Sequence, residues 1–319
     1  MNLLISSHID PYINLATEEY LLKNSVEDFI FLYVNRPCVV VGKHQITQKE
    51  INSSFIYANN ILVARRLSGG GTVYHDEGNL NFSYIQSIAP GGSISYQQIT
   101  QSIYGYLKNK IPTIELSERN DFTLQGKKIS GSAMHVYKNR LIAHGTLLIN
   151  CNLANLSTSL KVDQQRFTDK SISSRKAGVI NASSVYNGLN INTLIKEFTQ
   201  YLRALGPVSD YQLSKSASDT VHELARTKYS DKNWIFCYSP KYTYTNGFKF
   251  RKKLVQYQLE VVKGLIESVS IEQPDIISKA NYLNMCSMKG KLHNIFDLQN
   301  EFLDNDNYSF NIALLNSLF

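Results

Sequence analysis

Two arginines followed by three glycines form the part of this chain whose chemistry best suits an anion. Arg65 and Arg66 follow the apolar run 61–64, and the glycines 69–71 precede a second strand-like run, 72–74. Glycines let a backbone approach a ligand closely, and bared backbone N–H groups and guanidinium groups both bind phosphate or carboxylate. The stretch is also compatible with a glycine-rich hairpin that carries two surface arginines. It contains neither the Walker phosphate-binding motif nor the dinucleotide-binding fingerprint.

Two later stretches also place polar and small residues at predicted strand ends. Residues 125–126, Gln-Gly, are typical of a hairpin turn, which puts Lys128 near the start of the return strand. Residues 130–133 are all small, so another backbone or a ligand can approach them closely. Residues 143–150 form a further predicted strand with a polar start. On pattern alone, Lys127 and Lys128 would be an exposed pair on the hairpin.

The composition describes an ordinary folded protein and gives no sign of nucleic-acid binding. The chain has 319 residues, which is long for one domain and predicts two. Its hydrophobic residues, 43% of the total, supply a sizeable core. The net charge of +7 is spread along the chain, without the basic stripe and interleaved aromatic residues that nucleic acid favours. A mildly basic surface can equally attract an acidic protein or an anionic substrate.

Neither a membrane span nor a secretory signal is predicted. No apolar window of about 18 residues exists, and residues 1–8 lack a cationic segment followed by a long apolar one. The four cysteines are scattered without a Cys-x-x-Cys pair. That arrangement favours reduced thiols and disfavours a zinc site or a disulfide framework. We therefore expect a cytoplasmic protein.

The first helix is predicted from its cap. Asp10 followed by Pro11 is a typical helix start, because the aspartate accepts from the first free N–H groups and proline fits the first helical position. The spacing of the apolar residues that follow places them on one face. The same spacing predicts that Glu18, Glu19 and Lys23 point outward into solvent.

Further along, the pattern alternates between strands and helices. Strands are expected at 28–34, 38–41 and 81–85, and helices at 95–108 and 192–205. The chain therefore belongs to the α+β class.

A polar stretch of weak periodicity, residues 152–186, lies between the last predicted strand of this part and its last helix. Long irregular stretches in compact domains are usually functional or disordered. We interpret this one as a loop that orders over a ligand.

The pattern changes after residue 240. Residues 254–262 and 265–271 are strands of matching length joined by a Lys-Gly turn, and two helical segments follow. We expect two domains, a catalytic domain at 1–240 and a small α+β accessory domain at 245–319.

Taken together, these blocks resemble the lipoate–protein ligase family. The matching stretches are 14–19, 65–79, 119–121, 126–133 and 144–148, in the family's order and spacing. The resemblance covers about the first 180 residues, and the C-terminal part resembles the family's accessory domain more loosely. It implies a catalytic domain of the biotin/lipoate ligase type, with a mixed and antiparallel sheet flanked by helices.

The resemblance also implies an ATP-dependent, adenylate-forming reaction. Lipoate and ATP, with Mg²⁺, would give lipoyl-AMP and pyrophosphate, and a lysine of an acceptor lipoyl domain would then take the lipoyl group. Implied acceptors are the E2 subunits of 2-oxoacid dehydrogenases and the glycine cleavage H protein. We expect a monomer that binds neither nucleic acid nor a membrane. Which acceptor is preferred, and whether octanoate is used, does not follow from the residues.

By the same resemblance, Lys128 is the catalytic residue that bridges the lipoate carboxyl and the phosphate, since a compact ammonium has three donors. Asp121 would help hold Mg²⁺, which prefers few carboxylates together with phosphate oxygens. Adjacent strand residues face opposite sides, so only one of the two arginines can face the pocket, and the match favours Arg66. His135 stands where the family often has arginine, so no acyl contact is assigned to it.

The full set of residues that the resemblance places at the lipoate and ATP site is Arg66, Ser68, Gly69, Gly70, Gly71, Thr72, Val73, Tyr74, His75, Asn79, Asp121, Lys128, Ser130, Gly131, His144, Thr146 and Arg175.

Two other functions remain open at this point, and two more are disfavoured by the sequence. Related transferases use a cysteine thioester, for which we expect a cysteine just before the lysine hairpin, and residues 116–121 contain none. A lipoyltransferase that uses preformed lipoyl-AMP keeps the same pocket. A non-enzymatic lipoate-binding module requires that Lys128 is not used. Biotin ligases share the fold, but their glycine- and arginine-rich loop differs from residues 68–71.

Overall fold

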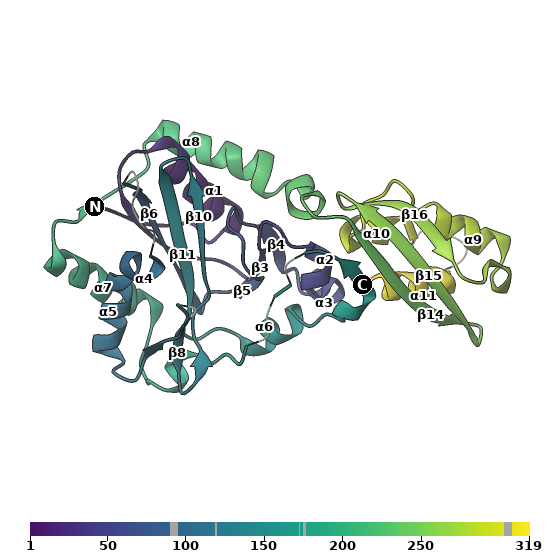
Figure 1. Ribbon diagram of the computed structural model, residues 1–319, viewed down its shortest axis with the longest axis horizontal. Coiled ribbons are helices and arrows are strands. Elements are labelled where there is room, and N and C mark those ends of the chain that lie inside the picture. Colours follow the sequence, from purple (N-terminus) through teal and green to yellow (C-terminus); the bar gives the residue numbers. More distant parts are fainter. Residues whose placement is uncertain (90–94, 119, 172, 175–176, 303–307) are drawn as a thin grey trace.

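The computed structural model describes residues 1–89, 95–118, 120–171, 173–174, 177–302 and 308–319. Its main sheet has the strand order β10-β11-β6-β2-β1-β13 and is mixed, because β1 pairs in parallel with β2 and β13 while the other pairs are antiparallel (Figure 1). These strands are β1 (Asn2–Ile5), β2 (Phe29–Val34), β6 (Asn79–Ser87), β10 (Ser132–Tyr137), β11 (Arg140–Leu148) and β13 (Ser209–Asp210).

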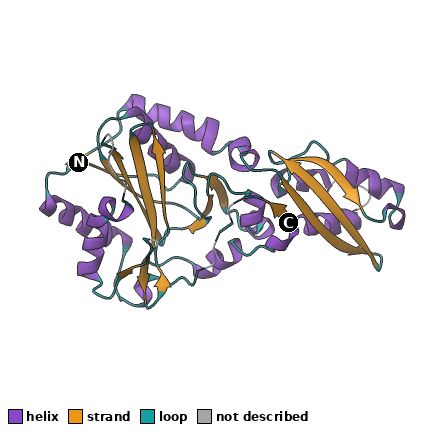
Figure 2. Ribbon diagram, in the orientation of Figure 1, coloured by secondary structure: helices purple, strands orange, loops and turns teal. Residues whose placement is uncertain are grey.

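Helices cover both faces of this sheet (Figure 2). In β2, Ile30 and Leu32 point to one face and Phe29 and Phe31 to the other, as the two-residue period of a strand requires. One face packs against α5 (Gln101–Lys110) and α7 (Ile191–Leu205), and the other packs against α1 (Pro11–Asn24). The α+β class is therefore confirmed. The remaining helices of this part are α2 (Thr47–Glu50), α3 (Ser53–Ala58), α4 (Tyr96–Ile99), α6 (Leu153–Ser159) and α8 (Lys215–Leu224).

Two short sheets position the polar stretches singled out in the sequence. One has the order β4-β3-β5, formed by β3 (Cys38–Val41), β4 (Leu62–Arg65) and β5 (Val73–His75). The other has the order β7-β8-β9, formed by β7 (Glu115–Leu116), β8 (Phe122–Leu124) and β9 (Lys127–Lys128). The hairpin reading of the glycine stretch is wrong, because β4 and β5 do not pair with each other. Both pair with β3, so the glycines cross from one edge of that sheet to the other.

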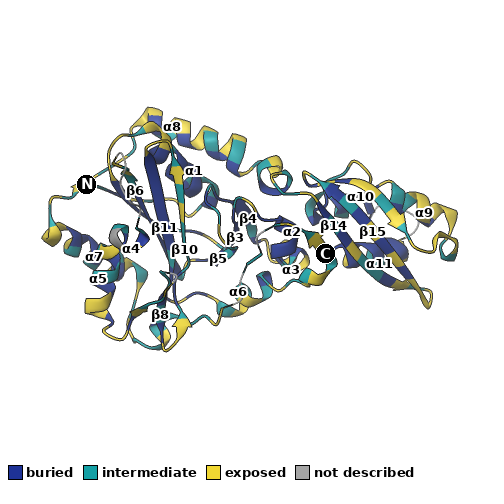
Figure 3. Ribbon diagram, viewed as in Figure 1, coloured by how far each residue is buried: buried dark blue, intermediate teal, exposed yellow. Residues whose placement is uncertain are grey.

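The prediction that Glu18 and Glu19 face solvent is also wrong. Helix α1 lies between the sheet and α8, so its Leu21 packs against the sheet while Leu15 packs against Val221 of α8. A helix buried on both sides has no solvent face at these positions, and both glutamates are buried. Figure 3 shows how little of α1 is exposed.

The interpretation of 152–186 as an irregular loop is wrong in part. This stretch contains α6 and the strand β12 (Phe167–Asp169). Strand β12 pairs with β14 and so belongs to the C-terminal sheet, in the order β12-β14-β15-β16. That pairing could not be read from local pattern, because Phe167 lies opposite Tyr244, far along the chain.

The C-terminal part has a core of its own, to which Tyr257, Phe302 and Phe310 contribute buried side chains. The predicted hairpin is present, with positive φ at Lys263 and Gly264. Its elements are β14 (Tyr242–Phe250), β15 (Lys253–Val262), β16 (Leu265–Ile271), α9 (Lys279–Cys286), α10 (Ile295–Phe302) and α11 (Tyr308–Leu318). We keep the division into 1–240 and 245–319 as a proposal. None of the helices in the described residues has the length and apolar character needed to cross a membrane.

Candidate functional site

The two arginines at the end of β4 point in opposite directions. Arg65 is fully buried, and its guanidinium donates to the carbonyl oxygens of Gly42 (3.0 Å) and Ile235 (2.7 Å) and to the Thr47 hydroxyl (2.7 Å). Arg66 instead lines a cavity on the opposite side. Only Arg66 therefore faces the pocket, and Arg65 joins the start of α2 to the segment near residue 235.

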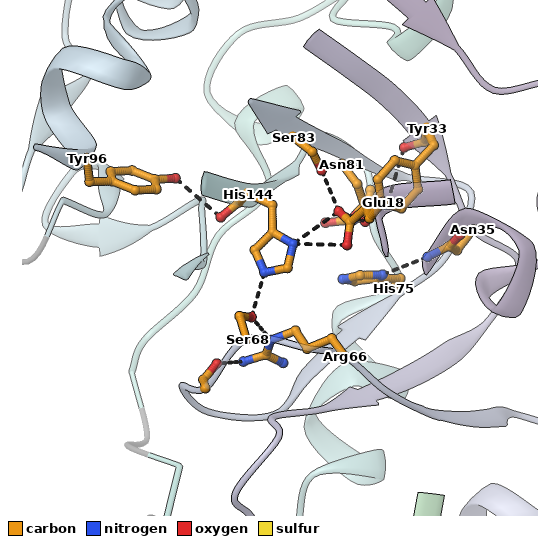
Figure 4. Close-up of polar contacts among 12 residues, drawn as sticks. Glu18, Tyr33, Asn35, Arg66, Ser68, His75, Asn81, Ser83, Tyr96 and His144 are labelled. Atoms are coloured by element: carbon orange, nitrogen blue, oxygen red, sulfur yellow. Dashed lines mark hydrogen bonds and ion pairs between the residues drawn. The ribbon is translucent and has the colours of Figure 1, made fainter. Parts of the chain in front are cut away.

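Arg66 donates hydrogen bonds to residues 68–71, which we call the glycine loop (Figure 4). Its Nη2 donates to the carbonyl oxygens of Gly69 and Gly71, both at 2.7 Å, and its Nε donates to Ser68 Oγ at 3.0 Å. A further bond joins Nη1 to the carbonyl of Val40. Burial lowers the pKa of Arg66 to about 10, which still leaves it charged at neutral pH. The guanidinium thus orders the loop carbonyls and keeps a positive charge beside the cavity.

A chain of buried polar groups continues from Arg66 into the sheet (Figure 4). Ser68 Oγ lies 2.7 Å from His144 Nε2, and His144 Nδ1 lies 3.0 Å from Glu18 Oε1. The Glu18 carboxylate also accepts from the hydroxyls of Tyr33 (3.0 Å) and Ser83. Burial acts to raise the pKa of Glu18, but His144 and these hydrogen bonds outweigh it, so the net pKa is lowered. Glu18 is therefore a buried carboxylate held in its charged form.

His75 borders the cavity with a neutral ring. Asn14 Nδ2 donates to Asn35 Oδ1 (2.8 Å), which orients the Asn35 amide so that its Nδ2 donates to His75 Nδ1 (3.0 Å). The proton of the neutral ring must then sit on Nε2. That atom is buried and has no hydrogen-bond partner within the described residues, and His75 lines the cavity. Burial lowers the pKa of His75 to about 3, so the ring is neutral.

Lys128 reaches the same cavity from the predicted hairpin. The turn between β8 and β9 has positive φ at Gln125 (52°) and Gly126 (69°), so the sequence prediction of a turn there is confirmed. Lys128 Nζ forms an ion pair with Asp121 Oδ2 at 3.0 Å, and both residues line the cavity. The ion pair with Asp121 therefore positions the Lys128 ammonium, which remains accessible to a ligand in the cavity.

Two cavities meet at Lys128. The first has a volume of about 350 Å³ and is lined by Arg66, His75, His144 and Asp121 among others. The second has a volume of about 510 Å³ and is largely apolar, with leucines contributed by α6. The residues that line both are Thr72, Val73, Lys128, Gly131, Thr146 and Ser174. Two ligands could therefore lie end to end with their reactive groups beside one ammonium.

Most residues predicted for the site line one of these cavities. Those on the first are Arg66, Gly71, Thr72, Val73, His75, Asp121, Lys128, Gly131, His144 and Thr146, and the second adds Tyr74 and Ser130. Four predicted residues line neither cavity, namely Ser68, Gly69, Gly70 and Asn79. The first three form the braced loop, and Asn79 is buried in β6. Arg175 lies outside the described residues.

Sequence reasoning missed several polar residues of the site. Tyr33 and Asn81 line the first cavity, Glu50 lines the second, and Glu18 holds His144. One signal was available for Glu18, since Asn14 and Glu18 lie one turn apart on the same face of α1. Tyr33 and Glu50 carried no comparable signal.

The donor groups present fit a Mg²⁺ ion that is bound mainly by its substrate. No cluster of three or more His, Cys, Asp or Glu side chains suited to a metal occurs in the part of the chain that the structure describes. One carboxylate, that of Asp121, faces the first cavity beside Lys128. Mg²⁺ commonly takes one or two protein carboxylates and completes its shell with phosphate oxygens and water.

Comparison with known proteins gives a consistent result. The family described as the lipoyl protein ligase A/B catalytic domain matches residues 10–203. Lipoate–protein ligase 1 of Staphylococcus aureus is 38% identical over 265 residues, covering 82% of this chain and 81% of that protein. Lipoate–protein ligase LplJ of Bacillus subtilis is 35% identical over 271 residues, with the same two coverages.

Solved structures show the same fold. The structure of P. falciparum LipL1 in complex with lipoate is similar with a TM-score of 0.62 and 24% identity, covering 99% of this chain and 98% of that one. A lipoate–protein ligase A bound with ATP is similar with a TM-score of 0.59 and 23% identity, covering 74% of this chain and 98% of that one.

Proposed function

The chain belongs to the lipoyl protein ligase A/B family, and we propose that it activates lipoate with ATP and transfers the lipoyl group to a lysine of an acceptor lipoyl domain. The observation that carries this function is the meeting of two cavities at Lys128. An adenylate-forming ligase must bring two anions together, a carboxylate and an α-phosphate. One ammonium shared by both cavities offsets their mutual repulsion.

In the first step, a carboxylate oxygen of lipoate attacks the α-phosphorus of ATP. The new P–O bond gives lipoyl-AMP, and pyrophosphate leaves. Lys128 contacts both anions and stabilises the charge that develops between them. Asp121 fixes the ammonium through its ion pair (3.0 Å) and is the carboxylate that would hold Mg²⁺. That ion, when bound, supplies charge neutralisation at the phosphates.

We assign the acyl chain to the first cavity and the nucleotide to the second. The first is bordered by the apolar side chains of Leu15 and Val40 and by the neutral ring of His75. The second is the larger and carries Lys161 in addition to Lys128, which suits phosphates. Both cavities border Thr72, which follows the three glycines, and Val73, the first residue of β5.

In the second step, the amine of the acceptor lysine attacks the acyl carbonyl of lipoyl-AMP. A C–N bond forms, AMP leaves, and the nitrogen loses a proton. An acyl adenylate is already activated, so no strong protein base is required. We propose a monomer in the cytoplasm whose acceptors are E2 subunits or the glycine cleavage H protein.

The experiment that tests this function is lipoate-dependent ATP–pyrophosphate exchange with the wild-type chain and with Lys128→Ala. We expect exchange in the wild type and a loss of at least about 100-fold in the variant, the effect of removing one charge-stabilising donor. Lys127→Ala is the matched control, because the neighbouring ammonium is exposed and borders neither cavity. Transfer from synthetic lipoyl-AMP without any exchange would contradict the proposal and indicate a lipoyltransferase.

A further inference from the structure

Strand β10 begins at the site and ends as an unpaired edge. Its first two residues, Ser132 and Ala133, line the first cavity together with Lys128. The strand then runs to Tyr137 as the outermost member of the main sheet, beside β11 (Figure 1). Within the described residues no strand pairs with its other side. An unpaired edge is a template for strand addition unless it is covered or charged.

The register shows which backbone groups of β10 point outward. Gly131 lies opposite Thr146 and its carbonyl accepts from the Thr146 N–H at 2.9 Å, so this position belongs to the hydrogen-bonded set. In an antiparallel ladder the hydrogen-bonded positions alternate along the strand. His135 and Tyr137 therefore bond to β11, whereas the N–H and C=O groups of Met134 and Val136 face away from it.

The two faces of this edge differ in chemistry. Met134 and Val136 lie opposite Ala143 and Leu141 and are apolar, with 39% and 46% of their surface exposed. Exposed apolar residues along a strand edge are characteristic of a binding surface.

The other face of the edge is basic. Lys23 Nζ lies 5.0 Å and Lys138 Nζ 5.4 Å from the centre of the Tyr137 ring. Lys23 is also ion-paired with Glu19 at 2.6 Å, whereas Lys138 lies exposed at the end of the strand. A strand added here would meet the ammonium of Lys138 on this face.

We propose that β10 is the docking edge for the acceptor, which adds a strand to it with acidic residues toward the lysines and apolar residues toward Met134 and Val136. This inference rests on the proposed function, because the occupant is the protein whose lysine must enter the cavity beside Lys128. The alternation of acidic and apolar residues follows from the two-residue period of a strand. Backbone pairing supplies affinity, and the lysines supply orientation and speed of encounter.

The first test compares Val136→Pro with Val136→Ala. Proline removes the outward N–H without breaking a bond to β11, and an edge position of this kind tolerates it. Alanine keeps the N–H and is the control for loss of the side chain. With an E2 lipoyl domain as acceptor, we expect KM for the acceptor to rise at least about tenfold more in the proline variant. Lipoate-dependent ATP–pyrophosphate exchange should be unchanged in both.

The second test uses charge. Lys138→Glu should raise KM for the acceptor about fivefold or more at low salt and weaken its salt dependence, whereas Lys249→Glu, on the exposed side of β14, should change neither. Lys138 borders neither cavity, so ATP–pyrophosphate exchange should be unchanged in this variant.

Hydrogen exchange tests the edge independently of catalysis and of any folding defect. On addition of the acceptor, the amides of Met134 and Val136 should exchange at least about tenfold more slowly, while those of His135 and Tyr137 are already protected by β11. The inference would be overturned if KM for the acceptor were equal in Val136→Pro and Val136→Ala and the acceptor did not slow amide exchange at Met134 and Val136. Protection that appears without acceptor as the chain dimerises would also overturn it. If the wild-type chain shows no lipoate-dependent ATP–pyrophosphate exchange, the proposed function is contradicted. The hydrogen-exchange measurement would still show whether the acceptor binds at β10.

Discussion

Glu18 and His144, which are 126 residues apart in the chain, are hydrogen-bonded at 3.0 Å in the buried centre of the site. Ser68 bonds to the other ring nitrogen and to Arg66, so the loop, the helix α1 and the strand β11 are joined through one imidazole. The ring of His144 borders the first cavity. Its orientation, and with it the shape of the acyl end of the cavity, therefore depends on a carboxylate that does not itself line the cavity.

Replacement of Glu18 by Gln should lower the free energy of unfolding by about 2–4 kcal/mol, because it removes one partner of a buried, charge-assisted network. The amide cannot accept from Tyr33, Ser83 and His144 together. Urea unfolding measures the change, and Glu27→Gln, at an exposed position, should alter stability by less than about 0.5 kcal/mol. Equal stability of the two variants would contradict the assigned network.

The stabilisation that Glu18 contributes should depend on pH. Because the folded-state pKa of Glu18 lies below its ordinary value of 4.5, its stabilisation is complete above that pH and is lost as the pH falls through the folded-state pKa. The stability difference between the wild type and Glu18→Gln should therefore shrink in acid. A difference that grows below pH 4.5 would contradict a charged Glu18.

His75 should oppose folding at mildly acidic pH. Its folded-state pKa of about 3 is below the ordinary 6.5, so between these values the unfolded chain binds a proton that the folded chain does not. Stability should fall by about 1.4 kcal/mol per pH unit on acidification from 6.5 because of this one group. His75→Gln should remove that part of the slope in urea unfolding at pH 6.5 and 5. An NMR titration of His75 with a midpoint near 6.5 would contradict the prediction.

Replacement of Arg65 should lower the free energy of unfolding far more than replacement of a surface arginine. Arg65→Met leaves several buried carbonyl oxygens, including those of Gly42 and Ile235, without a donor. We expect a loss of at least about 3 kcal/mol, because each unsatisfied buried acceptor costs about 1–3 kcal/mol. Arg36→Met, which breaks an ion pair at the surface, should cost no more than about 1 kcal/mol in the same denaturation experiment.

Sequence signals within a few residues were sufficient to predict the elements whose contacts are local, namely a helix start, a hairpin turn and the alternation along one strand. The cap of α1 was predicted from Asp10, whose carboxylate accepts from the Tyr12 N–H at 2.8 Å. The turn at residues 125–126 was predicted from Gln-Gly, and it brings Lys128 to the cavity. The opposite directions of Arg65 and Arg66 followed from the strand period alone.

The rest depends on contacts that are distant in the chain. Asn14 lies one turn before Glu18, but no residue near them in the chain identifies Ser83 and His144 as the partners of Glu18, so this charged helical residue was expected to face solvent. Strands β4 and β5 flank a glycine stretch, which locally favours a hairpin, but β3 inserts between them. Strand β12 exists only because β14 is available to pair with it.

Gly42 should be indispensable for the shape of the glycine loop. A Cβ added at Gly42 would lie 2.1 Å from the carbonyl oxygen of Gly70, so Gly42→Ala must displace the loop that Arg66 braces. We expect a stability loss of about 1–3 kcal/mol, typical of overpacking. Lipoate-dependent ATP–pyrophosphate exchange should fall by at least about tenfold, since a displacement of about 1 Å in a positioning group has effects of this size or larger. Gly206→Ala, where a Cβ meets no atom within 4 Å, is the control and should leave exchange unchanged. Full activity of Gly42→Ala would show that the loop position is not required for adenylation.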